Sequence, residues 1–451
     1  MALSSEPNRA MSSTEFASTF SSRILGQTSR FQRFASTLDP SGSTFVTSTP
    51  LLNGDLRSVI KPSSHPSSGG ELKKIMEDMI YTPLGSIPWG ATVTSGPITS
   101  SSVLSRSAIS SASSSGRSDE TLVFFKASHA LGDGVSLGAI LGELSDEAPD
   151  LRERVQLEMK KRRRRKKKSL LARLVAYVKK LAWFVRGIAM IAKQQFGMLC
   201  YNNCNPFADL LKVPIPGGER KRSLAWVSTI TVEDARCVSR SLGCSINDLF
   251  VACVSKAVDR QILTHVASGV MAEEGGERKG RVRCVIPVHL YGGLLLPGQE
   301  IGNRIGAVSA EIEVDDEAGA CFNTLQETKE KLKIIKEAPS ALVSFGLAKV
   351  VSNLPSALAT KLLKLAMSGS CVAISNVRGP DIPLNVNGCR VEQVVGFVPP
   401  PPSVPIGVVV MSYNGKITIT LNGDRRAVPD GEVFLSWILE EYGKLALLSL
   451  K

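Results

Sequence analysis

A single histidine lies close to a carboxylate and two glycines in the heptapeptide SHALGDG, residues 128–134. The apolar run 122–125 before it indicates a buried strand, and apolar spacing from Val135 onward indicates a helix. His129 therefore falls at a strand-to-helix turn, with Asp133 four residues later. An imidazole held in one orientation can accept a proton from an alcohol or an amine as that group attacks an acyl carbonyl.

Spacing alone leaves two interpretations of His129 open. In one, His129 is a general base, Asp133 orients the ring or fixes the turn, and Gly132 and Gly134 leave room for a substrate. In the other, it is an ordinary buried histidine in a strand–turn–helix connection. The remaining histidines lie in a Ser/Pro-rich loop, after an amphipathic helix and at the end of an apolar strand, and we interpret them as structural: His65, His265 and His289.

Length and composition set the class of protein. A chain of 451 residues favours two domains of about 200 residues each, and 43% hydrophobic and 21% charged residues are typical of a globular protein. The nine cysteines form no CxxC pair, so we expect reduced thiols in an intracellular compartment and no zinc site or disulfide framework. The chain has no GxGxxG, P-loop or GxSxG motif, which argues against nucleotide-dependent chemistry and serine hydrolysis.

The net charge of +13 is concentrated in one run. Residues 160–168 (KKRRRRKKK) supply nine positive charges, which leaves +4 for the rest of the chain. Apolar residues then recur at three- and four-residue steps over 169–199, with basic residues opposite them, as in an amphipathic helix too interrupted by charge to span a bilayer. Two interpretations stay open: an anionic membrane surface as partner, or a solvated linker before a helix that packs on the protein. Nucleic acid is not expected, because no aromatic residues interleave the charges.

Strands and helices mix along both halves without a regular βαβ cadence. The spacing predicts helices over 71–80, from Thr231, from Ser245 and from Asp430; strands over 224–230, 282–290, 307–314 and 372–376; a turn at 302–306; and a hairpin of 407–413 with 416–421 through Asn414-Gly415. The serine-dominated tract 92–118 predicts a long surface loop.

At this point the motifs carry a resemblance. The heptapeptide 128–134 resembles the HHxxxDG motif of acyl-CoA-dependent acyltransferases, and the chain as a whole is similar to the bifunctional wax ester synthase/diacylglycerol acyltransferase family, especially its plant-like members. Further family motifs are resembled by residues 82–89 (TPLGSIPW, its shortened PLDRxRPLW segment), 245–248 (SIND), 283–290 (RCVIPVHL, its RxxVPVS strand), Gly302-Asn303 and 375–380 (SNVRGP). The resemblance covers about residues 71–450.

The resemblance implies a mixed α/β, two-lobed chloramphenicol-acetyltransferase-like fold with the active site between the lobes. It implies O-acyl transfer from acyl-CoA to diacylglycerol or a long-chain alcohol, with His129 as general base and Asp133 holding the geometry. Acyl-CoA would be a co-substrate, with no bound cofactor and no metal. The residues expected to shape substrate binding are Ser128, Gly134, Asn247, Asp248, Asn376 and Gly379.

The expected organisation follows from this resemblance. Residues 1–38 would be a disordered or transit-like N-terminus, 39–159 an N-terminal lobe, 160–201 the basic run and crossover, and 202–451 a C-terminal lobe. We expect an intracellular, membrane-associated protein of the endoplasmic reticulum or lipid droplet, or of the plastid if 1–38 is a transit peptide.

Two departures from the family pattern keep alternatives open. Ser128 stands where the family has its first histidine, and the segment 82–89 lacks the family's Asp and Arg. The alternatives are a catalytically silent relative that binds lipid or membrane through 160–199, and an acyltransferase for another alcohol or an amine.

Overall fold

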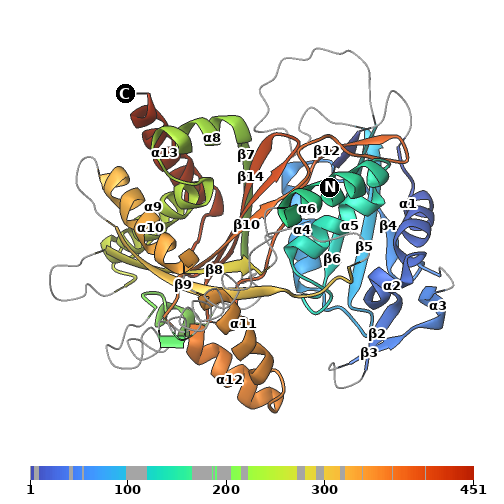
Figure 1. Ribbon diagram of the computed structural model, residues 1–451, viewed down its shortest axis with the longest axis horizontal. Coiled ribbons are helices and arrows are strands. Elements are labelled where there is room, and N and C mark those ends of the chain that lie inside the picture. Colours follow the sequence, from blue (N-terminus) through green and yellow to red (C-terminus); the bar gives the residue numbers. More distant parts are fainter. Residues whose placement is uncertain are drawn as a thin grey trace.

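Two six-stranded β-sheets organise the chain into two lobes that lie side by side (Figure 1). The structure is a computed structural model, and it describes residues 2–4, 10–39, 44–52, 55–97, 119–164, 205–214, 222–271, 280–290, 299–314, 320–337, 339–367, 369–401 and 403–450, with three isolated positions, 185, 188 and 189. The expected two-lobed, mixed α/β fold is confirmed.

The N-terminal lobe is built on a sheet with strand order β11-β12-β1-β6-β5-β4. Its strands are β1 (Ala2–Ser4), β4 (Ile60–Ser63), β5 (Trp89–Pro97), β6 (Asp119–Ala127), β11 (Asn385–Val386) and β12 (Cys389–Gln393), and β2 (Ser36–Leu38) and β3 (Phe45–Thr47) form a separate ribbon. Its helices are α1 (Ser13–Phe20), α2 (Thr28–Phe31), α3 (Thr49–Leu52), α4 (Gly69–Tyr81), α5 (Gly134–Leu144) and α6 (Ala148–Arg164), with a π-helical turn at Ser21–Leu25 and a 3₁₀ turn at Gln32–Ala35.

Residues 10–38 differ from the expectation of a disordered N-terminus, because their side chains fill the core of this lobe. Phe20 and Phe34 are fully buried, and Phe20 stacks on Trp89 of β5 with ring centroids 4.6 Å apart. Arg30 of α2 and Arg152 of α6 both bind the buried carboxylate of Glu143 in α5, whose pKa these partners lower against the opposing effect of burial. The Ser/Thr-rich composition misled because four phenylalanines are spaced among the polar residues.

The serine-rich tract also differs from the expected surface loop in its first part. Residues up to Pro97 continue β5, which pairs antiparallel with β6 from Trp89 opposite Ala127 to Pro97 opposite Asp119. Thr94 is buried in this strand, because small hydroxyl side chains fit a pleated surface as well as a loop. The remainder of the tract, 98–118, lies outside the described residues.

The C-terminal lobe is built on a sheet with strand order β7-β14-β13-β10-β8-β9. Its strands are β7 (Arg222–Thr231), β8 (Gly280–His289), β9 (Ile305–Val314), β10 (Val372–Arg378), β13 (Ile406–Tyr413) and β14 (Lys416–Asp424), and its helices are α8 (Val232–Ser241), α9 (Ile246–Ala267), α10 (Ala320–Glu337), α11 (Ser340–Val351), α12 (Ser356–Met367) and α13 (Gly431–Ser449). A 3₁₀ turn at Leu210–Lys212 precedes the first of these elements. The strands, the helix starts and the hairpin predicted here are confirmed; α10, α11 and α12 were not predicted.

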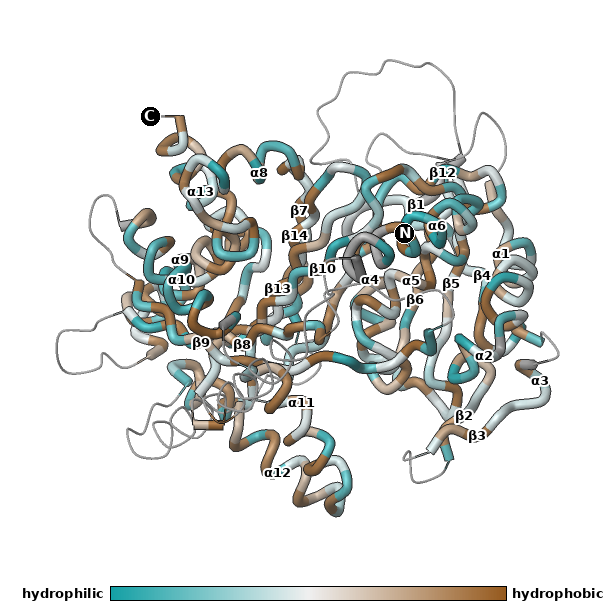
Figure 2. Tube along the Cα trace, in the orientation of Figure 1, coloured by the Kyte–Doolittle hydropathy of each residue, from teal (hydrophilic) through white to brown (hydrophobic). Residues whose placement is uncertain are grey.

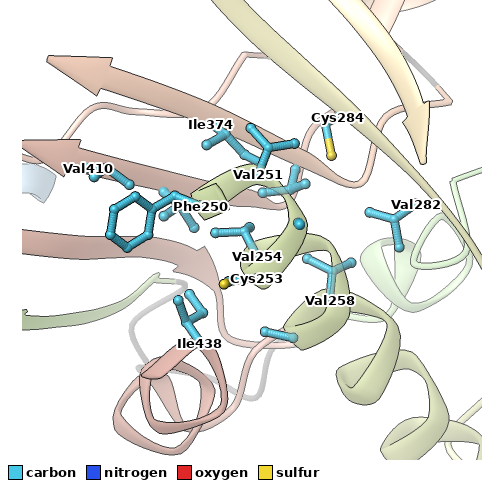
Figure 3. Close-up of a cluster of buried hydrophobic side chains, with 14 of the residues drawn as sticks. Phe250, Val251, Cys253, Val254, Val258, Val282, Cys284, Ile374, Val410 and Ile438 are labelled. Carbon is cyan, nitrogen blue, oxygen red and sulfur yellow. The ribbon is translucent and has the colours of Figure 1, made fainter. Parts of the chain in front are cut away.

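Helix α9 is the central element of this core (Figure 3). Its apolar side chains Val251, Val254 and Val258 pack among residues of the sheet such as Val282 and Ile374. The helix starts where the sequence predicts, because a capping box closes its first turn. The Ser245 side chain accepts from the Asp248 amide, and the Asp248 side chain accepts from the Ser245 amide.

Residues 385–393 leave the C-terminal lobe and join the sheet of the other lobe, so the expected boundary at residue 202 does not separate the lobes cleanly. Strand β12 pairs with β1, and Val386 and Val391 are fully buried in the N-terminal core. Tyr413, at the end of β13, accepts from the Leu384 amide and donates to the Val391 carbonyl. These two bonds, 2.9 and 2.8 Å long, attach the segment 385–393, which we call the excursion, to the end of a strand of the C-terminal sheet.

The basic run begins inside helix α6, which extends to Arg164. The rest of the run and the amphipathic helix expected over 169–199 lie outside the described residues, apart from the isolated positions. Among the described helices, none is by itself long and apolar enough to cross a bilayer; α8 and α9 meet the length and composition criteria only as a pair bent by 91°.

Candidate active site

His129 lies in the turn that joins β6 to α5, and its side chain is exposed. The turn is fixed on both sides: the Ser128 amide donates to the Pro88 carbonyl at 2.7 Å, and the Leu131 amide donates to the Ser128 carbonyl at 3.0 Å. Leu131 is fully buried and anchors the turn to the N-terminal core. The turn therefore presents the imidazole from a rigid backbone.

Asn303, which precedes β9 in the C-terminal lobe, holds His129 by two contacts. Its Nδ2 donates to the His129 carbonyl at 2.6 Å, and its Oδ1 lies 3.1 Å from His129 Nδ1. Because Nδ2 already donates to a carbonyl, the other amide atom is the oxygen and accepts, so His129 Nδ1 carries the proton. Nε2 is then the unprotonated, basic nitrogen. A general base needs this tautomer, because Nε2 is free to accept the proton of the acceptor hydroxyl.

Asp133 is almost fully buried, at 1% exposure, and caps helix α5. Its Oδ1 accepts from the Ser136 amide and its Oδ2 from the Arg304 amide, both at 2.9 Å. Ser136 Oγ in turn donates to the Gly302 carbonyl at 2.9 Å. One carboxylate thus joins the first turn of α5 to the loop that carries Asn303, and both of these bonds come from backbone amides and not from the imidazole of His129.

His289, interpreted from the sequence as structural, approaches the site from the end of β8. Its Nε2 lies 3.7 Å from Asp133 Oδ2, which is too long for a hydrogen bond. Burial lowers the pKa of His289, and Arg304 acts in the same direction, while Asp133 opposes them. Burial and Arg304 thus favour the neutral form of His289, whose ring lies beside the Asp133 carboxylate.

Gly132 allows the turn to close tightly on the start of α5, and Gly134 allows it to approach the C-terminal lobe. A Cβ on Gly132 would lie 2.7 Å from Ser136 Cβ, and one on Gly134 would lie 3.2 Å from Val377 Cγ2. Val377 belongs to β10 and to the segment SNVRGP, so this segment packs against the start of α5. The two motifs therefore lie in contact, while the roles expected of their residues stay predictions.

The other predicted site residues divide into two groups. Near the site, Ser128 Oγ accepts from the Ala130 amide at 3.3 Å, Asn376 is exposed on β10 beside Val377, and the Gly379 amide donates to the Ser412 carbonyl at 2.9 Å. Farther along the C-terminal lobe, Asp248 is occupied by its capping bond and by Lys336 Nζ at 2.8 Å. The contacts described for Asp248 do not reach His129, and Asn247, partly exposed, lies beside it at the start of α9.

Sequence reasoning missed His289, Arg304 and Ser136 as members of the site and gave Asn303 no role beyond its motif. The residues lie in segments about 170 positions away from His129 or, for Ser136, inside a helix where a serine is unremarkable. The adjacency of Gly302-Asn303 to the RCVIPVHL strand was the available signal, because β8 and β9 pair with His289 opposite Ile305.

The described residues contain no group of three or more His, Cys, Asp or Glu side chains arranged to hold a metal ion. The described cysteines are free thiols, and burial raises the pKa of Cys284 to about 12. A thiol with such a pKa is protonated at pH 7 and a poor nucleophile.

Two lobes with an HxxxDG turn at their junction define the chloramphenicol-acetyltransferase-like class of folds. Solved structures share this architecture. A wax ester synthase/diacylglycerol acyltransferase from Marinobacter aquaeolei VT8 aligns with a TM-score of 0.56 and 18% identity over 100% of this chain and 93% of that one. A trichothecene 15-O-acetyltransferase from Fusarium sporotrichioides aligns with a TM-score of 0.62 and 12% identity over 99% of this chain and 89% of that one.

The particular family follows from the sequence. The wax ester synthase/diacylglycerol acyltransferase catalytic domain matches residues 117–250, and the WS/DGAT C-terminal domain matches residues 301–446. The first range contains His129 and Asp133, and the second contains Asn303 and Asn376. The chain belongs to the wax ester synthase/diacylglycerol acyltransferase family.

Curated relatives agree with this assignment. A putative diacylglycerol O-acyltransferase of Mycobacterium tuberculosis is 25% identical over 334 residues, 68% of this chain and 61% of the relative. Wax ester synthase/diacylglycerol acyltransferase 1 of Arabidopsis thaliana is 21% identical over 329 residues, 69% of this chain and 66% of the relative. The chain thus spans about three fifths to two thirds of the length of these relatives.

Proposed function

We propose that this protein is an O-acyltransferase that moves a fatty acyl group from acyl-CoA to diacylglycerol, to a long-chain alcohol, or to both. The family assignment supports the reaction class, and the names of the relatives support both acceptors. Acyl-CoA enters as a co-substrate, so the reaction requires no resident cofactor.

In the proposed mechanism, His129 Nε2 removes the proton from the acceptor hydroxyl as its oxygen attacks the thioester carbonyl. The tetrahedral intermediate then expels the CoA sulfur, which takes the proton back from Nε2. One C–O bond forms, one C–S bond breaks, and the imidazole returns to its starting state. No covalent acyl-enzyme is needed, in keeping with the protonated state of the buried Cys284.

The observation that carries this proposal is the pair of contacts by which Asn303 holds the ring and the carbonyl of His129. An exposed histidine normally samples several rotamers and both tautomers, whereas this one is bound through its Nδ1 and its carbonyl by a single side chain. That arrangement leaves the basic Nε2 free for an acceptor hydroxyl.

The test is an assay of purified protein with labelled acyl-CoA and, side by side, diacylglycerol and long-chain alcohols. Wild type should form ester, and His129→Gln should reduce turnover roughly 10²–10⁴-fold, the usual contribution of a general base. Because His129 is exposed, the variant should keep the thermal stability of wild type. Equal turnover in the two proteins would exclude His129 as the base.

A second candidate function is a catalytically silent, lipid-binding relative. Ser128 in place of the first motif histidine favours it, because that position lies directly beside the proposed base. Protein that binds acyl-CoA but forms no ester with any alcohol or amine acceptor would support this second candidate. Ester formation with an amine or a short alcohol alone would instead change only the acceptor.

We also propose that the basic run 160–168 attracts the protein to anionic membranes of the endoplasmic reticulum or lipid droplet. Each cation near such a surface contributes about 1 kcal/mol, so nine consecutive cations are a strong electrostatic signal. Replacement of the run by glutamines should lower binding to anionic vesicles and reduce its dependence on salt.

A further inference from the structure

Helices α11 and α12 form a helical pair that stands at one edge of the molecule, below β8 and β9 in the view of Figure 1. Helix α11 packs on the start of β9: the Ala307 amide donates to Ser344 Oγ at 3.0 Å, and Gly306 lies directly against the Ala341 carbonyl. Helix α12 has no buried residue at all. We call residues 340–367 the α11–α12 hairpin.

The hairpin is rich in exposed apolar side chains, and Figure 2 shows hydrophobic stretches along both of its helices. Eight of the 23 large apolar residues that are exposed in the described chain lie in these 28 positions: Leu342, Leu347, Val350, Leu354, Leu358, Leu362, Leu363 and Leu365. Exposed apolar residues scattered singly are ordinary, whereas a concentration of them on one pair of helices indicates a surface that binds a partner or a membrane.

The charges of the hairpin identify the partner. It carries three lysines, Lys349, Lys361 and Lys364, and no Asp or Glu. None of the three takes part in an ion pair among the described residues. On α12, Leu358 and Leu362 share one face by their four-residue spacing, and the two lysines lie together at its side, the arrangement of a helix that lies in a membrane interface.

Helix length excludes a hairpin that crosses the bilayer, and charge excludes the segment 160–199 as its partner. Twelve residues of α-helix extend about 18 Å, too short to cross a bilayer core of about 30 Å, so each helix suits the plane of the interface. The segment 160–199, which lies mostly outside the described residues, is itself strongly basic, and its cations would repel those of the hairpin. An anionic surface complements both.

We propose that the α11–α12 hairpin docks the protein on anionic lipid bilayers, with the apolar residues inserted among the acyl chains and the lysines at the headgroups. This surface is distinct from the basic run. The hairpin is connected to the site through β9, because Ile305 at the start of β9 pairs with His289, the residue beside Asp133. If the proposed acyl transfer holds, docking here places the site next to the bilayer that contains the lipid acceptor.

The test measures binding of the full-length protein to phosphatidylcholine vesicles with and without phosphatidylserine, at low and high salt. The variant Leu347→Asp/Leu358→Asp/Leu362→Asp should lower the partition coefficient about tenfold or more on both vesicles, because it removes apolar insertion. Lys361→Gln/Lys364→Gln should lower it about tenfold on the anionic vesicles alone. All five residues are exposed, so both variants should melt as wild type does.

The matched controls lie elsewhere in the C-terminal lobe. Val433→Asp/Leu447→Asp/Leu450→Asp places three charges at exposed apolar positions of α13 and the residue after it, and Lys333→Gln/Lys416→Gln removes two exposed lysines of α10 and β14. Both controls should bind vesicles as wild type does.

Vesicle binding that is unchanged in the leucine variant would overturn the proposal and leave the basic run as the membrane contact. A wild type that self-associates through the hairpin, with a monomeric leucine variant and unchanged vesicle binding, would overturn it in favour of a second copy of the chain. Ester formation is measured separately, with diacylglycerol or a long-chain alcohol supplied in detergent micelles in place of a bilayer. Absence of ester together with hairpin-dependent binding would reject the proposed function and retain the docking surface.

Discussion

Asn303 bridges the two lobes by holding both the backbone and the ring of His129, with Nδ2 donating to the carbonyl at 2.6 Å and Oδ1 lying 3.1 Å from Nδ1. The histidine follows a strand of one sheet and the asparagine precedes a strand of the other. Correct docking of the lobes is therefore what sets the tautomer of the proposed base.

The first prediction concerns this contact. Asn303→Ala should lower kcat by on the order of 10²-fold with a smaller change in KM, because the base loses its orientation but the substrate surfaces remain. Asn303→Asp keeps an acceptor for Nδ1–H and should therefore retain more of kcat than Asn303→Ala does. Asn323→Ala, at an exposed position of α10, is the control. Equal losses of kcat in Asn323→Ala and Asn303→Ala would contradict the positioning role.

The second prediction concerns the contact between helix α11 of the α11–α12 hairpin and strand β9. Gly306→Ala should destabilise the protein by more than the usual 1–3 kcal/mol of overpacking, because its Cβ would lie 1.8 Å from the Ala341 carbonyl oxygen, a backbone atom. Gly443→Ala in α13 is the matched control: its Cβ would meet nothing within 4 Å, and alanine favours a helix by about 1 kcal/mol. Urea unfolding of both variants measures the difference. A Gly306→Ala protein as stable as wild type would show that α11 can move away from β9.

The third prediction concerns pH. Burial lowers the pKa of His289, with Arg304 adding to the effect and Asp133 opposing it. The unfolded chain therefore binds a proton at His289 at a higher pH than the folded protein does. The resulting stability is complete above the unfolded pKa of about 6.5 and is lost as the pH falls below it.

His289→Gln should flatten this dependence between about pH 6.5 and 5, as measured by denaturant unfolding at a series of pH values. The carboxylates with lowered pKa, such as Glu143, lose their contribution only at more acidic pH and should be unaffected by the change. A slope that is the same in the variant and in wild type would assign the dependence to other groups.

The fourth prediction concerns the N-terminal segment. Phe20→Ala should cost about 3–5 kcal/mol of unfolding free energy, because the ring is fully buried and stacks on Trp89. Phe322→Ala, at a ring that is 39% exposed on α10, should cost far less. Deletion of residues 1–38 should leave the N-terminal lobe unable to fold, with loss of the cooperative transition. A truncated protein that melts as wild type does would refute the structural role of this segment.

The sequence predicted the elements whose ends are set by local chemistry. Ser245 with Asp248, and Asp430 with the next amides, cap helices through bonds within three residues, and Asn414-Gly415 makes its turn with positive φ at both positions. It did not predict the place of residues 10–38, because the partners that bury Phe20 and Phe34 are distant in sequence.

In the candidate site too, local features were predicted from the sequence and contacts between distant segments were not. The turn that carries His129 is local and was predicted, as was the structural position of Asp133. The proximity of His289 to Asp133 and the bonds of Asn303 depend on how two sheets dock, and no spacing in one chain encodes that distance.

The excursion of residues 385–393 makes the two halves of the chain interdependent. A protein cut within 165–204 would give an N-terminal fragment that lacks β11 and β12 and a C-terminal fragment whose Val386 and Val391 have no core to enter. The sheet of the N-terminal fragment is thus incomplete, and the two strands that it lacks belong to the other fragment. Co-expressed halves should therefore reassemble into the folded protein by complementation, while the N-terminal half alone should aggregate through its open sheet edge.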